Sequence, residues 1–186
     1  MADDRDELKQ IVRQVSYEVR EVTLASGKKS SFYFDAKQTT LHPRGAVLVG
    51  RVFFAELSHF PGPIHGVGGL TMGADAIASA TSITSSLAGT PIPAFIIRKE
   101  PKGHGTGQWL EGRKNLVPGA RVVIIEDVLT TGGSALQAVE RARAEGLQVL
   151  GIISLVDREE GGREAIEAKG LPLRAIFTKS EVVGDQ

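Results

Sequence analysis

The feature that most constrains this chain is a run of four β-branched residues, 122–125 (VVII), followed at once by two acids and a Thr/Gly/Ser turn. A short apolar run of this kind predicts a buried strand. After Gly132 and Gly133, small and apolar residues recur at helical spacing over residues 134–144. A strand that leads through a tight turn into a helix is the repeating unit of α/β proteins. We therefore expect a layered α/β fold.

The rest of the chain continues this alternation. Apolar runs predict further strands at residues 64–68, 94–97, 149–156 and 173–177. Apolar periodicity and end signals predict helices at residues 4–17, 44–58, 73–87 and 162–168. Because the strands are uniformly apolar, the sheet should be mostly parallel and covered by helices on both faces. Residues 1–40, with a predicted hairpin between 22–24 and 31–35, should form a small N-terminal hood.

Composition excludes several classes of protein. The 186 residues suit one domain, 1–186, and Lys+Arg equals Asp+Glu at 22 each, which argues against a nonspecific nucleic-acid binder. Cysteine is absent, so disulfides and thiolate chemistry are impossible. No apolar run reaches the roughly 20 residues that span a bilayer, and the charged N-terminus does not resemble a signal peptide. We expect a cytoplasmic protein without membrane or nucleic-acid partners.

One segment, residues 100–117, interrupts the alternation. It shows no apolar periodicity and contains four glycines together with several basic residues, among them Lys102 and His104. A long irregular segment inside a compact domain is usually a functional loop or a dispensable insertion. The cluster of basic side chains favours a mobile functional loop.

The turn after the central strand has the chemistry of a phosphate site. Its glycines permit close backbone approach, and the start of the following helix presents free N–H groups and a positive dipole end. We call residues 130–134 the cradle. The acids before it, Glu126 and Asp127, can accept hydrogen bonds from the hydroxyls of a sugar or help to hold a phosphate-bound metal ion, although a pair of charges near a helix start is also a common structural feature. A ribose 5-phosphate fits both parts, with its phosphate in the cradle and its hydroxyls against the two acids.

These residues carry a resemblance to a known family. Residues 124–134 (IIEDVLTTGGS) resemble the 5-phosphoribosyl 1-diphosphate (PRPP) signature of the type I phosphoribosyltransferases. Residues 98–105 (RKEPKGHG) look like the mobile catalytic loop of the orotate phosphoribosyltransferase family, and residues 24–34 and 157–162 resemble its orotate-side segments. The resemblance implies a type I phosphoribosyltransferase-like parallel sheet flanked by helices, with the small N-terminal hood.

It also implies a reaction, in which ribose 5-phosphate passes from PRPP to orotate and yields orotidine 5'-phosphate and diphosphate in de novo pyrimidine (UMP) biosynthesis. Mg²⁺ is the implied cofactor, held mainly through PRPP and without direct protein ligands. The implied catalytic residues are Lys102, His104 and Asp127. The implied PRPP-binding residues are Arg98, Lys99, Lys102, His104, Glu126, Asp127, Val128, Leu129, Thr130, Thr131, Gly132, Gly133 and Ser134.

Orotate carries a carboxylate, and an arginine can pair with it through two parallel hydrogen bonds. The resemblance places Arg158 on orotate together with Thr130 and Phe34, although a lone arginine is often a surface residue and an aromatic residue in a hairpin is often part of the core. It further implies a homodimer with shared active sites. Arg98 and Lys102 would then act across the interface, and Lys99 and His104 in their own subunit.

The chain departs from the family at two places. Ala25 stands where many members have a lysine, and Thr71-Met72 stands where many have Tyr-Lys, so diphosphate binding should depend more on the loop. Two alternatives stay open. A purine-type phosphoribosyltransferase would keep the cradle but would not need Arg158. A non-catalytic regulator that senses PRPP would keep the fold without the chemistry.

Overall fold

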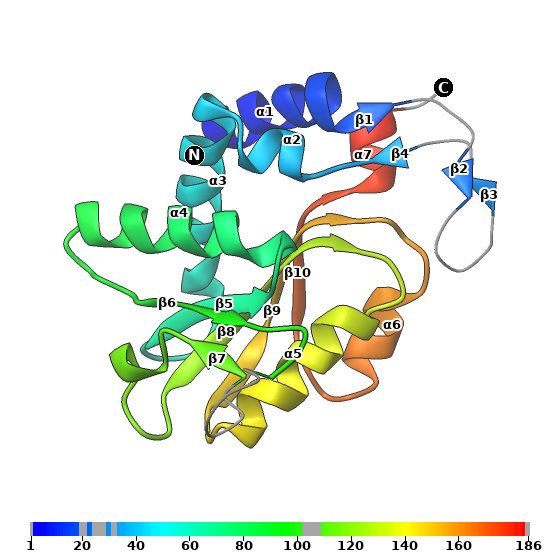
Figure 1. Ribbon diagram of the computed structural model, residues 1–186. Helices are drawn as coiled ribbons and strands as arrows, with labels where there is room; N and C mark the ends of the chain where they lie inside the picture. The colour runs from blue at the N-terminus through cyan, green and yellow to red at the C-terminus, as the bar shows by residue number, and fades with distance from the viewer. Residues whose placement is uncertain (1, 19–21, 24–28, 31–32, 102–108, 185–186) are drawn as a thin grey trace.

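The computed structural model describes residues 2–18, 22–23, 29–30, 33–101 and 109–184. Its centre is a six-stranded sheet in the order β10-β9-β8-β5-β6-β7 (Figure 1). Five strands are parallel, and β7 pairs antiparallel with β6 at one edge. The strands are β5 (Gly66–Leu70), β6 (Ala94–Ile97), β7 (Leu110–Glu111), β8 (Arg121–Leu129), β9 (Gln148–Asp157) and β10 (Leu173–Thr178).

Helices cover both faces of this sheet (Figure 1). One face carries α3 (Pro43–Glu56), the short 3-10 turn η2 (Leu57–His59) and α4 (Gly73–Leu87), with α1 (Ala2–Ile11) packed against α3, and the other carries α5 (Gly133–Ala144) and α6 (Gly162–Glu167). Alternate residues of β8 serve the two cores: Val123 and Ile125 pack in the first, and Val122 and Ile124 in the second. The predicted parallel sheet with helices on both faces is confirmed.

Two central strands differ from their predicted bounds. β8 continues to Leu129, so the two acids lie within the strand, because pairing with β9 persists up to Leu129 opposite Asp157. β5 covers 66–70 instead of 64–68. Its glycines have low strand propensity, but a Cβ at Gly69 would collide with the backbone of β8 at Ile125. Close packing between β5 and β8 therefore determines where β5 lies. The strand propensity of its residues does not reveal this position.

The N-terminal part differs more. The predicted helix at 4–17 is α1 followed by a π-helical segment, η1 (Val12–Ser16). The predicted pairing of 22–24 with 31–35 is wrong, because β2 (Val22–Thr23) pairs with β3 (Lys29–Ser30), whereas β4 (Tyr33–Phe34) pairs with β1 (Tyr17–Glu18). Short elements of this kind take their partners from tertiary packing, which sequence periodicity does not report.

Two short helices, α2 (Lys37–Thr40) and α7 (Lys179–Val183), were not predicted. The C-terminal α7 lies beside α1 in Figure 1, and the side chains of Arg5 and Glu181 form an ion pair of 2.7 Å between them. The N-terminal hood is therefore held in part by the other end of the chain.

Residues 109–117 contain regular elements, although the sequence shows no apolar periodicity over 100–117. They form β7 and the 3-10 turn η3 (Arg113–Asn115), and Leu110 and Leu116 anchor them in the second core. Lys102 and His104 lie outside the described residues. Within the described part of the chain, no helix is both long and apolar enough to cross a membrane.

Candidate active site

The topology of the sheet marks one place for a ligand. β5 and β8 are parallel neighbours, but the chain leaves β5 toward β6 and leaves β8 toward β9 on the opposite side. Such a reversal opens a crevice beyond the carboxyl ends of the two strands, where open α/β sheets bind their ligands. The two acids lie near the carboxyl end of β8 and the cradle follows that strand, so both lie at this crevice.

Asp127 lies directly against the start of α4. Its Oδ1 accepts a hydrogen bond of 2.9 Å from the backbone N–H of Val128. A Cβ at Gly73, the first residue of α4, would stand only 2.7 Å from Asp127 Oδ2, so a larger residue there would displace the carboxylate. The positive N-terminal end of a helix is a favourable place for a carboxylate. The turn between β5 and α4 and the acid of β8 therefore belong to one site.

Glu126 differs from its neighbour in protonation. Only 8% of the residue is exposed, and this burial, followed by the charge of Asp127 and a hydrogen bond with it, raises the pKa of Glu126 to about 9. Glu126 therefore holds a proton at neutral pH and can donate a hydrogen bond. The assignment of both acids to a sugar diol stays a prediction, in which Glu126 can also act as a hydrogen-bond donor.

The cradle joins β8 to α5. Gly132 has φ +82°, a left-handed conformation that favours glycine, and it directly precedes the first turn of α5. Thr131, Gly133 and Ser134 are exposed, so a ligand can reach this turn, where the first N–H groups of the helix have no partner within it. Leu129 is buried in the core, so it can reach a ligand only through its backbone, whereas Val128 and Thr130 are half-buried.

The residues assigned to orotate meet beside the cradle. Arg158 follows β9, and its backbone N–H donates a hydrogen bond of 2.9 Å to the carbonyl of Leu129, where the cradle begins. Phe34 and Arg158 line the same small pocket with Tyr17 and Val156, although they come from opposite ends of the chain. The guanidinium is 7% exposed and lies 2.9 Å from Glu160. The structure thus brings the two predicted side chains together.

Arg98 and Lys99 lie on the other side of the crevice. They follow β6 and line a cavity of about 460 Å³ with Thr71 of the β5–α4 turn and Asp75 of α4. The hydroxyl of Thr71 donates a hydrogen bond of 2.7 Å to Asp75, and the peptide bond after Thr71 is cis. Arg98 forms an ion pair of 2.8 Å with Glu111 of β7. Two basic side chains thus face the turn where many family members carry a lysine.

Sequence reasoning missed Lys37, at the start of α2. A hydrogen bond from its ammonium group to Asp35, at 2.7 Å, raises the pKa of Lys37, and the charge of Asp127 raises it further. Burial raises the pKa of Asp35, but hydrogen bonds from Lys37 and Gln38 outweigh it and leave that pKa below its usual value. The ion pair holds a cation near Asp127. Only the fold places it there, because α2 carries no motif.

The chain is similar in sequence to known phosphoribosyltransferases. The family described as phosphoribosyl transferase domain matches residues 67–172. The orotate phosphoribosyltransferase of Sorangium cellulosum is 47% identical over 184 residues, which cover 99% of this chain and 95% of that protein.

Two crystal structures of orotate phosphoribosyltransferase from Mycobacterium tuberculosis are also similar to this chain. The first is a complex with Fe(III) dicitrate, with a TM-score of 0.84 and 40% identity over 96% of this chain and 98% of that one. The second is a complex with PRPP, with a TM-score of 0.79 and 39% identity over 97% of this chain and 99% of that one. The similarity spans both the sheet and the N-terminal hood.

Proposed function

Because this chain belongs to the orotate phosphoribosyltransferase family, we propose that it transfers ribose 5-phosphate from PRPP to orotate and releases diphosphate. The product, orotidine 5'-phosphate, is the precursor of UMP in de novo pyrimidine biosynthesis. One observation supports the substrate assignment: a backbone hydrogen bond joins the buried Arg158 to Leu129, the residue directly before the cradle. A phosphate site and a carboxylate site are thereby neighbours.

Each part of the site has a role in this reaction. The cradle binds the 5'-phosphate through backbone N–H groups and hydroxyls. Asp127 accepts hydrogen bonds from the ribose diol, and protonated Glu126 supports it as a donor. Arg158 pairs with the orotate carboxylate, and Phe34 borders the pyrimidine ring.

The leaving group needs positive charge. Negative charge grows on diphosphate as the ribose–oxygen bond breaks, so cations that approach it lower the barrier. Arg98 and Lys99 face the β5–α4 turn and suit this role. Lys102 and His104 complete the set in the proposal, as catalytic residues of the segment 100–117.

Mg²⁺ fits this site through its substrate. Mg²⁺ usually keeps its waters and binds through one or two carboxylates plus substrate phosphates. In the described part of the chain no three acidic, histidine or cysteine side chains gather as a metal site. We assign Mg²⁺ to the diphosphate of PRPP, where the ion would neutralise phosphate charge.

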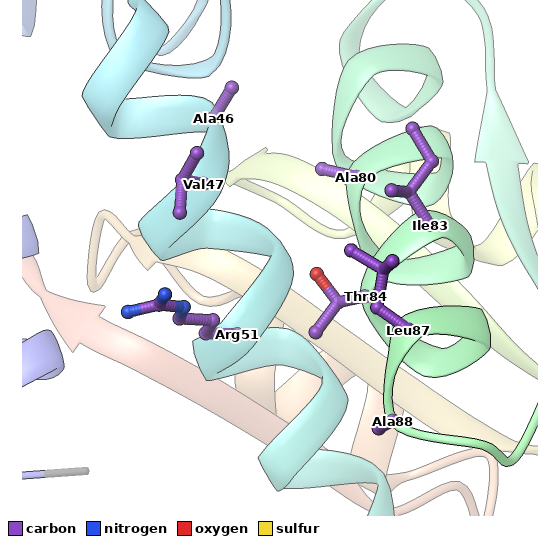
Figure 2. Close-up of a pocket in the computed structure, with 8 residues that line it drawn as sticks. All are labelled: Ala46, Val47, Arg51, Ala80, Ile83, Thr84, Leu87 and Ala88. Carbon is purple, nitrogen blue, oxygen red and sulfur yellow. The ribbon is translucent and has the colours of Figure 1, made fainter.

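A homodimer with shared active sites belongs to the same proposal. Figure 2 shows a groove between α3 and α4, about 480 Å³ in volume, lined mainly by apolar side chains. Three of them are well exposed: Val47 at 44%, Ile83 at 62% and Leu87 at 85%. An exposed apolar patch on a helical layer is typical of a subunit interface. We assign this face to the contact with the partner subunit.

We also propose the cytoplasmic location that the sequence predicts.

The decisive experiment measures diphosphate release with Mg²⁺ and PRPP, comparing orotate, uracil, adenine, hypoxanthine and xanthine. Orotate should be consumed in strong preference to the others. Turnover with a purine base instead would favour the purine-type alternative. Tight PRPP binding without turnover of any base would favour the regulator.

A further inference from the structure

Arg141 of α5 contacts both stretches of chain that flank residues 102–108. Its Nη1 donates a hydrogen bond of 2.5 Å to the carbonyl of Arg98, and its Nη2 donates one of 3.1 Å to the carbonyl of Lys99. The guanidinium also stacks over the ring of Trp109, with 4.1 Å from Cζ to the ring centroid. A single side chain thus binds the end of β6 and the residue that leads into β7.

These contacts fix the backbone of two proposed substrate-binding residues. The N–H of Arg98 donates a hydrogen bond of 2.9 Å to the carbonyl of Trp109, which closes a small network around Arg141. With their carbonyls turned toward α5, Arg98 and Lys99 line the cavity that holds Thr71. Planar guanidinium geometry suits two parallel carbonyl bonds and a stacked ring at once, which an ammonium cannot reproduce.

Arg141 lies on the same helix, α5, that begins in the cradle. The helix begins at Gly133 in the cradle, and Arg141 lies eight residues further along. At 1.5 Å per residue, about 12 Å of rigid helix separates the two ends. Ala138 and Ala142 pack this helix against the sheet. One rigid element therefore holds the phosphate cradle at its start and the backbone of Arg98 and Lys99 near its end.

We propose that Arg141 is a positioning residue for the diphosphate side of the site. It acts through Arg98 and Lys99 and sets their distance from the cradle, which binds the other end of the same substrate. This inference rests on the proposed function, because it assigns both groups to PRPP. Misplacement by about 1 Å can cost on the order of 100-fold in rate, so an indirect contact of this kind matters.

The test compares Arg141→Met, which keeps much of the side-chain length without donors or charge, with Arg141→Lys, which keeps the charge. Arg143→Met is the matched control, because Arg143 is exposed on the same helix. We expect Arg141→Met to lower kcat/KM for PRPP about 10- to 100-fold, to leave KM for orotate within about twofold and to keep Tm near the parent value. Arg141→Lys should fall between Arg141→Met and the parent, and Arg143→Met should match the parent.

Trp109 provides a readout that does not depend on activity, because it is the only tryptophan of the chain. Loss of the stacked guanidinium should shift its emission and raise its quenching by acrylamide in Arg141→Met but not in Arg143→Met. Parallel losses for PRPP and orotate with a lowered Tm would show a structural role and overturn the inference, as would unchanged PRPP kinetics. A parent protein that fails to use PRPP at all would instead overturn the proposed function, while the fluorescence still tests the contact.

Discussion

The guanidinium of Arg158 lies 2.9 Å from the carboxylate of Glu160, and only 7% of the arginine side chain is exposed. The arginine assigned to the orotate carboxylate thus already faces an internal carboxylate. Glu160 is about one-third exposed and can turn toward solvent at modest cost. Substrate binding then exchanges one carboxylate partner for another.

Replacing Arg158 by alanine should weaken orotate binding and leave PRPP binding intact. A hydrogen bond to a charged group contributes about 1.5–3 kcal/mol, which corresponds to roughly 10- to 100-fold in affinity. Calorimetry with each ligand separately measures both effects, with Arg143→Ala as the control. Equal losses for the two ligands would contradict the assignment.

Replacing Glu160 by glutamine should have the opposite effect on orotate. The amide competes less well for Arg158 than a carboxylate does, so KM for orotate should fall by about three- to tenfold. Glu164→Gln, an exposed neighbour on α6, should leave KM unchanged. A raised KM in Glu160→Gln would show that Glu160 holds Arg158 in place for the substrate instead of competing with it.

The pKa of Glu126 predicts a pH-dependent stability. Its folded-state pKa of about 9 exceeds the ordinary value of 4.5, so its contribution is fully present below about pH 4.5 and is lost as the pH rises through 9. Glu126→Gln carries no such proton. Its stability advantage over the parent should therefore be small near pH 5 and grow to a few kcal/mol near pH 8.5.

Urea unfolding of both proteins at these two pH values, without PRPP or Mg²⁺, measures this difference. Asp127→Asn should lower the pKa of Glu126, because it removes the neighbouring negative charge. The pH range over which the protein loses stability should therefore end at a lower pH than in the parent. A gap between Glu126→Gln and the parent that stays constant with pH would show that Glu126 is ionised when folded.

Asp127→Asn should also lower turnover, because an amide is a poorer acceptor than a carboxylate for the two ribose hydroxyls. A loss of roughly 10-fold or more in kcat/KM for PRPP corresponds to one charge-assisted hydrogen bond. Glu126→Gln keeps a donor at the neighbouring position and should lose less. Steady-state kinetics of the two variants at pH 7 compares them, and an unchanged Asp127→Asn protein would refute its role.

Shared active sites make a prediction about mixtures. Lys102→Ala and Asp127→Asn should each have much reduced activity alone, and subunit exchange should raise it, because one site of the heterodimer combines an intact segment 100–117 with an intact Asp127. Native mass measurements verify the exchange. Exchange without a gain in activity would mean that Lys102 acts in its own subunit.

Leu87→Glu tests the proposed subunit interface. It places a charge on the apolar groove between α3 and α4, so it should sediment as a monomer and should not complement. Glu140→Gln, an exposed change on the opposite helical layer, should remain dimeric.

The parts that the sequence determined by itself are those with a local physical cause. Helix α4 matches its predicted bounds, because apolar residues and the closing Gly89 lie within one continuous segment. The cradle is also local: Gly132 and the residues after it form a strand-to-helix turn wherever the chain goes next. The cradle could be identified as a phosphate site for this reason, and the parallel sheet followed from the apolar strands. Arg158, Phe34 and the basic residues after β6 were assigned only through the family resemblance.

Only the tertiary structure decided what depends on distant neighbours. Phe34 meets Arg158, Asp127 meets Gly73, and Arg141 reaches the end of β6, all across long stretches of sequence. The protonation of Glu126 belongs to this group, because burial and a neighbouring charge set a pKa and neither exists in an extended chain. Local pattern specifies which groups are present, and packing specifies which of them meet and which carry charge.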